Sequence, residues 1–323
     1  MLRLTLTMIC MASLVSPAFG AIKTTQINNT DYISLAEWTK AKALAWSWIK
    51  RDSTLFVTNR NLKLLLIADS REARANNVEV WLLFPLANRS GKLFISRLDA
   101  ETTLGPLLFP PHNNAGDRLK NICLDPGHGG KDPGNRVGTH YEKVYTLRLA
   151  SELRDQLEKA GFNVTLTRAD DDYVDLAERP SVAKRHYADL FISLHFNATS
   201  TGRDSVKGAE TYSLTPAGAR STAAAGTGPF AELQPGNRFD GKNMLLAYEI
   251  HGSLVRKLSV EDRGVKRARF QVLREATVPA VLIEGGFMSH PKEGKKISDA
   301  AYRREMAKAI VNGIQAYKRA VER

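Results

Sequence analysis

Four side chains that can bind a metal ion or transfer a proton stand where predicted strands end or a predicted helix begins. His128 lies in LDPGHGGKDPG, directly after an apolar run, His195 closes the run DLFISLH, and Glu284 precedes two glycines in AVLIEGG. Glu142 opens a helical pattern in HYEK. A histidine between glycines can be an ordinary turn residue, but glycines also remove side chains so that another group can approach closely.

Two imidazoles and one carboxylate are a common ligand set for catalytic zinc, which keeps one coordination position for water. Hydrolysis then requires a second carboxylate outside the metal shell as general base and proton shuttle. Glu284 suits that role, because burying a carboxylate beside glycines without a partner charge is costly for the fold alone. For the remaining ligand the residues leave two choices: Glu142, which a helix's first turn also favours electrostatically, and His140. Considered without the other motifs, His195 can also be a buried core histidine whose ring nitrogens are hydrogen-bonded.

The chain after residue 120 alternates between strand-like and helical patterns. Strands are predicted at 120–124, 162–167, 189–195, 208–214, 268–273 and 279–284, and helices at 141–160, 175–187, 241–258 and 298–320. Strands separated by helices predict an α/β fold with a mainly parallel, twisted sheet and helices on both faces. Active sites in such sheets lie beyond the carboxyl ends of the strands. The four side chains are therefore expected to converge at one edge.

Four segments, in their order and spacing, resemble the zinc-dependent N-acetylmuramoyl-L-alanine amidases, a family of cell-wall amidases: ICLDPGHGGKDPG, YEK, ADLFISLHFNA and RGVKRARFQVLREATVPAVLIEGGFMSHPKE. The resemblance covers residues from about 120 to 320. It implies zinc ligands at His128, Glu142 and His195, and a catalytic glutamate at Glu284. The implied reaction is hydrolysis of the amide between the lactyl group of muramic acid and the L-alanine of the stem peptide. Peptidoglycan is then the expected substrate.

Two rival functions use the same residues. A zinc peptidase would cut within stem peptides, and a wall-binding module would have lost catalysis, which the intact set of four residues argues against. The chain departs from the family pattern at Thr146, where an amide residue is usual, and at His290, where asparagine is common. Neither position is an implied ligand. We interpret His186, His251 and His290 as structural.

A long segment rich in glycine, alanine and proline, residues 215–242, follows the strand predicted at 208–214. Loops of this length are usually functional or disordered. One hypothesis is that it leaves the sheet beside the metal cleft and covers the cleft, with Glu232 as a regulatory residue whose carboxylate takes the fourth zinc position in place of water. The alternative is a solvated loop without contact to the metal.

Residues 21–105 are predicted to form a small α+β module, joined by a linker at 106–119 to the amidase-like domain at 120–323. Strands are predicted at 55–58, 62–68, 78–84 and 92–96. YISLAEW is echoed by FISRLDAET, which predicts a strand followed by a capped helix twice. The module resembles the copper-amine-oxidase-like N-terminal module of exported bacterial enzymes, a stalk or wall-binding unit. Its tryptophans are interpreted as core residues, with a glycan-binding face as the alternative: Trp38, Trp46, Trp48 and Trp81.

Residues 1–20 are typical of a secretory signal peptide, with a single charge at Arg3, an apolar run and the small-residue ending AFG. Cleavage before Ala21 predicts an exported protein of the periplasm, cell envelope or extracellular space, without stable membrane insertion. The formal net charge of +12 loses only the charge of Arg3 on cleavage, which predicts association with peptidoglycan and other anionic envelope polymers, not with nucleic acid. Because Cys10 leaves with the signal, Cys123 has no partner for an internal disulfide.

Overall fold

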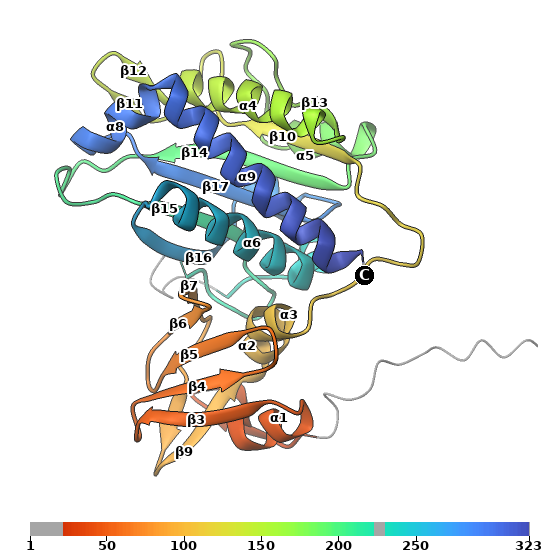
Figure 1. Ribbon diagram of the computed structural model, residues 1–323, viewed down its shortest axis with the longest axis vertical. Helices are drawn as coiled ribbons and strands as arrows, with labels where there is room; N and C mark the ends of the chain where they lie inside the picture. The colour runs from red at the N-terminus through yellow and green to blue at the C-terminus, as the bar shows by residue number, and fades with distance from the viewer. Residues whose placement is uncertain (1–21, 223–229, 323) are drawn as a thin grey trace, which may run out of the picture.

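An eleven-stranded β-sheet runs through both predicted parts of the chain (Figure 1). The computed structural model describes residues 22–222 and 230–322, so the predicted signal peptide lies outside the described residues. In spatial order the strands are β13 (Asn163–Leu166), β10 (Asn121–Pro126), β14 (Leu190–Asn197), β17 (Ala280–Phe287), β15 (Ala209–Leu214), β16 (Asp262–Ala268), β7 (Val78–Trp81), β6 (Glu72–Ala75), β5 (Lys63–Ile67), β4 (Thr54–Thr58) and β3 (Ala45–Lys50).

The half of the sheet that follows residue 120 is mainly parallel, as predicted. β13, β10, β14 and β17 run parallel to one another, whereas β15 pairs antiparallel with β17 and parallel with β16. The carboxyl ends of β10, β14 and β17 therefore share one edge of the sheet with the amino ends of β15 and β16.

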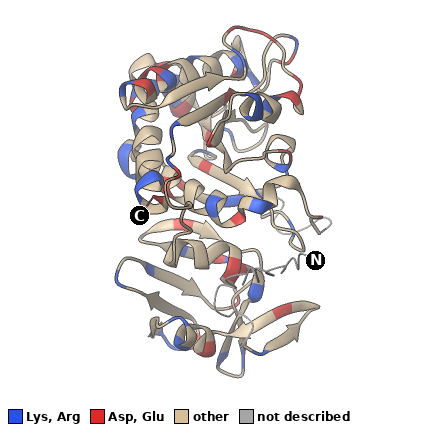
Figure 2. Ribbon diagram, turned by 90° about the vertical axis from the view of Figure 1, so that its right-hand side faces the viewer, with Lys and Arg blue, Asp and Glu red and all other residues tan. Residues whose placement is uncertain are grey.

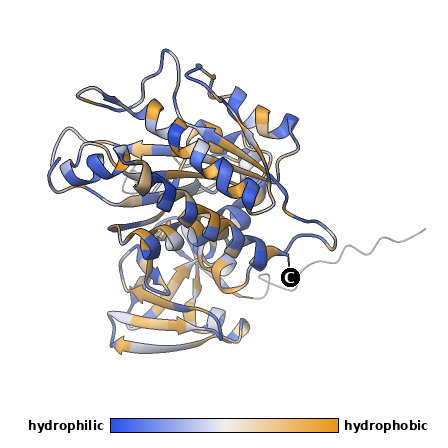
Figure 3. Cartoon of the chain, turned by 45° about the horizontal axis from the view of Figure 1, so that its top comes forward, coloured by the Kyte–Doolittle hydropathy of each residue, from blue (hydrophilic) through white to orange (hydrophobic). Residues whose placement is uncertain are grey.

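Helices cover both faces of this half, which confirms the predicted fold class. The helices that pack together across one face are α4 (Glu142–Lys159), α6 (Asp240–Leu258) and α9 (Ala300–Val321), and those on the other are α5 (Glu178–Arg185) and α7 (Gln271–Arg274). Apolar strands lie between helices whose outer faces are hydrophilic (Figure 3). A further helix, α8 (Pro291–Ser298), was not predicted.

β16 differs from the prediction, which placed a strand at 268–273. The strand ends at Ala268, and the short helix α7 occupies the second half of the predicted range. The charged sequence DRGVKRA does not indicate a buried strand, but its charges find partners within the fold. The buried Arg267, for example, donates hydrogen bonds to the backbone oxygens of Leu214 (3.0 Å) and Thr102 (2.5 Å).

The N-terminal part repeats a strand followed by a capped helix, as predicted. β2 (Thr30–Ser34) leads into α1 (Leu35–Ala41), and β9 (Lys92–Ser96) leads into α2 (Arg97–Asp99). In each case the side chain of the serine that ends the strand accepts a hydrogen bond from the backbone N–H three residues further on. β2 and β9 pair antiparallel within a second sheet, whose outer strands are β1 (Thr24–Ile27) and β8 (Ala87–Arg89).

The tryptophans of this part divide between core and surface. Trp38 is fully buried, as the core interpretation predicts. Trp46 and Trp48 lie on β3, at the outer edge of the large sheet, with their rings 6.0 Å apart, and Trp46 is exposed. The predicted strands did not include β3, because most of its residues face solvent and leave no apolar alternation to recognise.

The two parts of the chain join edge to edge. β7 pairs in parallel with β16 through Val80 and Val265. The indole Nε1 of Trp81 donates a hydrogen bond to the backbone oxygen of Arg263 (3.2 Å), and the backbone N–H of Glu79 donates to the Asp262 carboxylate (2.9 Å). One sheet therefore continues from the N-terminal part into the amidase-like part.

The segment predicted as a linker is packed along the molecule. It follows a π-helical turn (Ala100–Leu104) and contains most of α3 (Gly105–Leu108), which packs on α6. It then runs without helix or strand to β10, and the Lys318 ammonium group near the end of α9 donates to the backbone oxygen of Leu119 (2.8 Å). The division into two domains stays a prediction, as does the resemblance of the N-terminal part to a known module. None of the described helices is long and apolar enough to cross a membrane.

Candidate metal centre

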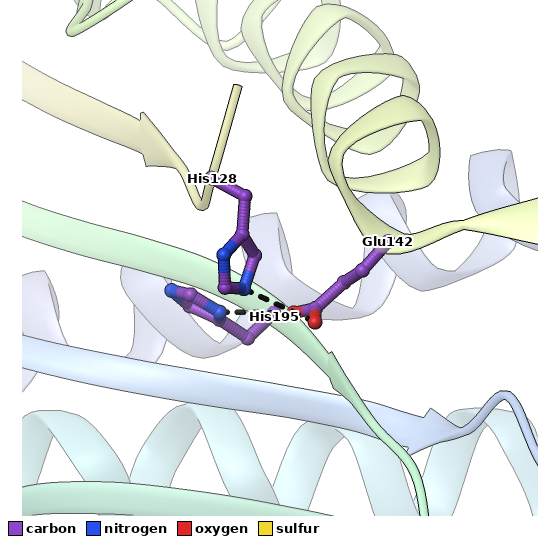
Figure 4. Close-up of side chains that lie close together, drawn as sticks. All are labelled: His128, Glu142 and His195. Atoms are coloured by element: carbon purple, nitrogen blue, oxygen red, sulfur yellow. Dashed lines mark hydrogen bonds and ion pairs between the residues drawn. The ribbon is translucent and has the colours of Figure 1, made fainter. Parts of the chain in front are cut away.

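Three of the four predicted side chains meet where the parallel strands end. His128 follows β10, Glu142 is the first residue of α4, and His195 lies near the end of β14. Each offers one ligand atom, and these atoms lie within 4.8 Å of one another. Figure 4 shows the two rings and the carboxylate pointing toward each other. The structure therefore brings the predicted ligand set together, while its occupation by zinc stays a prediction.

Glycines leave the space that the ligands themselves fill. A Cβ atom on Gly127 would overlap the imidazole ring of His195, and one on Gly134 would lie 2.5 Å from Cδ2 of His128 and 2.8 Å from Oε2 of Glu142. His128 itself has a φ of +61°, a left-handed conformation that is uncommon outside glycine. The sequence predicted that another group approaches His128 closely, and the groups that meet it in this loop are the side chains of Glu142 and His195.

Glu142 is the most constrained of the three. One carboxylate oxygen accepts hydrogen bonds from the backbone N–H of Phe196 (3.0 Å) and from Nδ1 of His195 (2.9 Å). The other accepts from the backbone N–H of Asn135 (2.9 Å) and lies 3.1 Å from Nε2 of His128. Burial raises the pKa of Glu142, but the hydrogen bonds and charges of the two imidazoles outweigh burial and hold the pKa well below its ordinary value. Glu142 is therefore an anion, as a metal ligand must be.

The alternative ligand, His140, points elsewhere. It lies in a short hairpin formed by β11 (Arg136–Val137) and β12 (His140–Tyr141), and its Nδ1 contacts the hydroxyl of Tyr145. His140 does not belong to the group of ligand atoms within 4.8 Å among the described residues. Of the two candidates that the sequence left open, the structure places Glu142 with the histidines.

A layer of polar residues that the sequence did not single out holds His128 in place. Asp132 accepts a hydrogen bond at 2.8 Å from Nδ1 of His128, which leaves Nε2 for a metal. The buried Arg179 donates to the His128 backbone oxygen (2.9 Å) and to Asp125 (2.8 Å), and the buried Arg168 donates to the carbonyls of the two residues before His128. The sequence offered one indication of this layer: Asp125 and Asp132 are the first residues of the two Asp-Pro-Gly turns that enclose His128.

The departures from the family pattern have local roles. The Thr146 hydroxyl donates to the backbone oxygen of Gly127 (2.8 Å) and so supports the same loop. His290 caps α8, where its Nδ1 accepts from two backbone N–H groups. The buried His251 contacts Thr211 and Asp262, and His186 is exposed at the end of α5, in keeping with the structural roles predicted for all three histidines.

Glu284 lies next to the three ligands, in β17, where it is paired across the sheet with His195. Its side chain is half-buried, and its Oε2 atom is buried without a hydrogen-bond partner among the described residues. Burial, and then the charges of Glu142 and Glu210, raise the pKa of Glu284 well above its ordinary value. An unpartnered carboxylate beside two imidazoles and a second carboxylate fits a site that receives a divalent cation such as zinc and a water molecule.

Glu210 is a neighbour of this site that sequence reasoning missed. It lies in β15, paired across the sheet with Glu284, and it is buried. It forms ion pairs with Arg263 (2.7 Å) and Lys266 (2.8 Å) from β16. GAETYSL does place a carboxylate in a predicted strand, but the cations of RGVKRAR come next to it only through the pairing of β15 with β16, which local sequence does not reveal.

The glycine-rich segment that follows β15 departs from the prediction. Because β15 runs antiparallel to β17, residue 215 leaves the sheet at the edge opposite the three ligands, so the expectation that it leaves beside the metal cleft is wrong. Its described residues form local contacts, such as the backbone hydrogen bond from Ala231 to Ala219 (2.7 Å), and a short 3₁₀ helix (Pro235–Phe239). Residues 223–229 lie outside the described residues. Glu232 is exposed, and its regulatory role stays a prediction.

Comparison with known proteins adds an independent finding. Residues 122–316 match the family model described as N-acetylmuramoyl-L-alanine amidase. Protein YqiI of Bacillus subtilis (strain 168) is 33% identical over 199 residues, which are 61% of this chain and 84% of the relative. A probable cell wall amidase, LytH of Staphylococcus saprophyticus, is 36% identical over 201 residues, which are 61% of this chain and only 58% of the relative.

A solved structure gives the same result for the fold. The crystal structure of an N-acetylmuramoyl-L-alanine amidase from Clostridium difficile 630 superposes with a TM-score of 0.53 at 32% sequence identity. The match covers 62% of this chain and 97% of that one. The matched family region contains His128, Glu142, His195 and Glu284.

Proposed function

The chain belongs to the N-acetylmuramoyl-L-alanine amidase family, and from this premise we propose that it hydrolyses the amide between N-acetylmuramic acid and the L-alanine of the peptidoglycan stem peptide. The observation that carries the proposal is the group of His128, Glu142 and His195 beside the unpartnered carboxylate of Glu284. In this proposal the first three residues hold one zinc ion and the fourth transfers the proton.

Zinc bound by these residues supplies a Lewis acid that polarises the carbonyl and lowers the pKa of a water molecule. Glu284 takes a proton from the attacking water and returns it to the departing amine of L-alanine. The position of Glu284 suits this exchange, because it is paired across the sheet with His195 and has a buried oxygen without a partner among the described residues. Asp132 fixes the tautomer of His128, and the two buried arginines hold the loop that carries this ligand.

We extend the proposal to location and binding partners. An exported enzyme of the periplasm, envelope or extracellular space would meet peptidoglycan directly, and a strongly positive formal net charge, +12 for the full sequence, favours association with anionic envelope polymers. Lysine and arginine residues are distributed over both parts of the chain and mixed with acidic residues (Figure 2). This distribution suits contact with an extended polymer at many points.

Product analysis tests the reaction. Mass spectrometry of purified peptidoglycan digested by the full chain should show peptides with a free N-terminal L-alanine and muramic acid without peptide. Cleavage within the stem peptide would identify a peptidase and overturn the proposal. Metal analysis should show about one zinc per chain, and zinc content that survives loss of both His128 and His195 would exclude the proposed ligands.

A further inference from the structure

The residues next to Glu284 differ sharply in how they are paired. His195, Glu284 and Glu210 occupy register positions side by side on β14, β17 and β15. Residues directly opposite each other on neighbouring strands have Cβ atoms about 5 Å apart and share a face of the sheet. Glu284 and Glu210 are therefore two neighbouring carboxylates, and like charges in this arrangement repel each other.

Two cations of β16, Arg263 and Lys266, pair with only one of the two carboxylates, Glu210. Oε1 of Glu210 accepts from Nε of Arg263 (2.7 Å) and from the Lys266 ammonium group (2.8 Å). Oε2 of Glu210 accepts from the hydroxyl of Tyr212 (2.5 Å) and the amide of Asn197 (3.3 Å). Both oxygens of Glu210 are thus occupied, whereas Oε2 of Glu284 is buried with no partner among the described residues.

We propose that Glu210 is a positioning residue of the amidase reaction, which holds Arg263 and Lys266 on itself and so keeps the neighbouring Glu284 carboxylate free of an ion pair. The inference rests on the function proposed above. A cation on Glu284 would occupy the lone pairs that must accept the proton from water, and would stabilise the charged form of the carboxylate. Glu210 does not touch the reacting atoms and acts through the cations that it holds.

Lys266 needs an anionic partner, because the fold keeps its side chain largely away from solvent. Lys266 has a side chain that is 15% exposed, and that of Glu210 is 4% exposed, so neither group is well solvated. If Glu210 lost its charge, a largely buried ammonium group would lack an anion, and a flexible lysine side chain can move the short distance to the adjacent carboxylate. Glu284 is that carboxylate.

The test begins with Glu210→Gln in the full chain, which keeps the side-chain shape and removes the charge. A crystal structure should show the Lys266 or Arg263 side chain bonded to Glu284. With zinc content unchanged, kcat on purified peptidoglycan should fall at least about tenfold while KM changes little, because the loss is in proton transfer. Replacing the cation that the structure shows on Glu284, in Glu210→Gln/Lys266→Met or in Glu210→Gln/Arg263→Met, should recover part of kcat, since the capturing cation is gone.

A matched control is Glu322→Gln, which removes the partner of Lys318 at the end of α9 and should leave kcat unchanged. If Glu284 stays unpaired in the Glu210→Gln structure, or if it becomes paired without loss of kcat, the inference is overturned. A loss of kcat that the double variant does not relieve also overturns it, because a purely structural ion pair would behave in that way. Wild-type protein that releases no N-terminal L-alanine would instead refute the proposed function, and the crystal structure would still decide the pairing.

Discussion

Glu284 shows how one residue can be prepared for chemistry at the expense of the fold. Its carboxylate lies beside Glu142 and Glu210 and has a buried oxygen without a hydrogen-bond partner among the described residues. A polar group buried in this way destabilises the folded state unless something else compensates. Function and stability therefore oppose each other at this position.

We predict that Glu284→Gln separates the two effects. The rate of amide hydrolysis should fall at least about 100-fold, because glutamine cannot accept the proton, while zinc content remains that of the wild type. The melting temperature of the metal-free protein at neutral pH should rise, because glutamine avoids the cost of burying or protonating a carboxylate whose pKa is raised in the folded state. Kinetics and metal analysis of the zinc-loaded variant, and calorimetry of variant and wild type after zinc removal, check all three. Near-normal turnover with bound zinc would show that the proton goes elsewhere.

The residue scale was also where the sequence was most informative. His128, His195 and Glu284 could be found because each follows an apolar run, and a parallel sheet collects the ends of such runs at one edge. Glu210 could not be found in this way, because it stands near the start of an antiparallel strand, whose direction the apolar pattern does not reveal.

At the scale of elements, the loop between β10 and α4 leaves space for the side chains of the proposed metal ligands. Its glycines are required for different reasons. Gly127 has no room for a Cβ atom, which would meet the His195 ring. Gly138 has a φ of +59°, and a Cβ atom added there would have open space within 4 Å.

We predict that Gly127→Ala displaces His195 and abolishes stoichiometric zinc binding. Gly138→Ala is the matched control: it should keep zinc and lose only about 1 kcal/mol of unfolding free energy, the cost of a left-handed non-glycine residue. Zinc titration and urea unfolding of both variants distinguish the two cases. Equal zinc affinity in both would show that the His195 ring can move without loss of the site.

The contact between β7 and β16 carries a pH-dependent contribution to stability. Burial raises the pKa of Asp262, but the His251 imidazole and the backbone N–H groups of Glu79 and Gly264 outweigh burial and hold the pKa below its ordinary value. A lowered pKa in the folded state stabilises the protein above the unfolded-state pKa of about 3.9, and this contribution is lost as pH falls through the folded-state value.

We therefore predict that Asp262→Asn lowers the unfolding free energy at pH 7 and that its difference from wild type shrinks below about pH 4. Urea unfolding at a series of pH values measures this difference. A destabilisation that is constant with pH would show that geometry, and not the charge of Asp262, is responsible.

The predictions of strands failed where charged or exposed residues left no hydrophobic pattern to recognise. β16 begins at Asp262 and not at residue 268, because its cations find partners only in the folded sheet. β3 was missed because it is almost wholly exposed. The prediction of where the segment after β15 leaves the sheet was wrong, because strand direction depends on long-range pairing, which local sequence does not encode.

At the scale of the whole molecule, the predicted boundary at 106–119 is crossed by both the sheet and the core. Buried apolar residues of the two parts, among them Val57, Val80 and Ile310, belong to one continuous cluster. We predict a single cooperative unfolding transition for the described parts of the chain, with equal calorimetric and van 't Hoff enthalpies. Two resolved transitions in calorimetry would show that the parts unfold independently.

The large sheet ends at β13 on one side, and the pairing of β7 with β16 decides which strand forms its other edge. A strand without a neighbour offers its backbone groups to other chains, which is a common origin of aggregation. Without β7, that open strand would be β16, which carries Arg263 and Lys266. The N-terminal strands move the open edge to β3, where Trp46 and Ile49 are exposed. The N-terminal part therefore covers the edge of the strand that carries the two cations of Glu210.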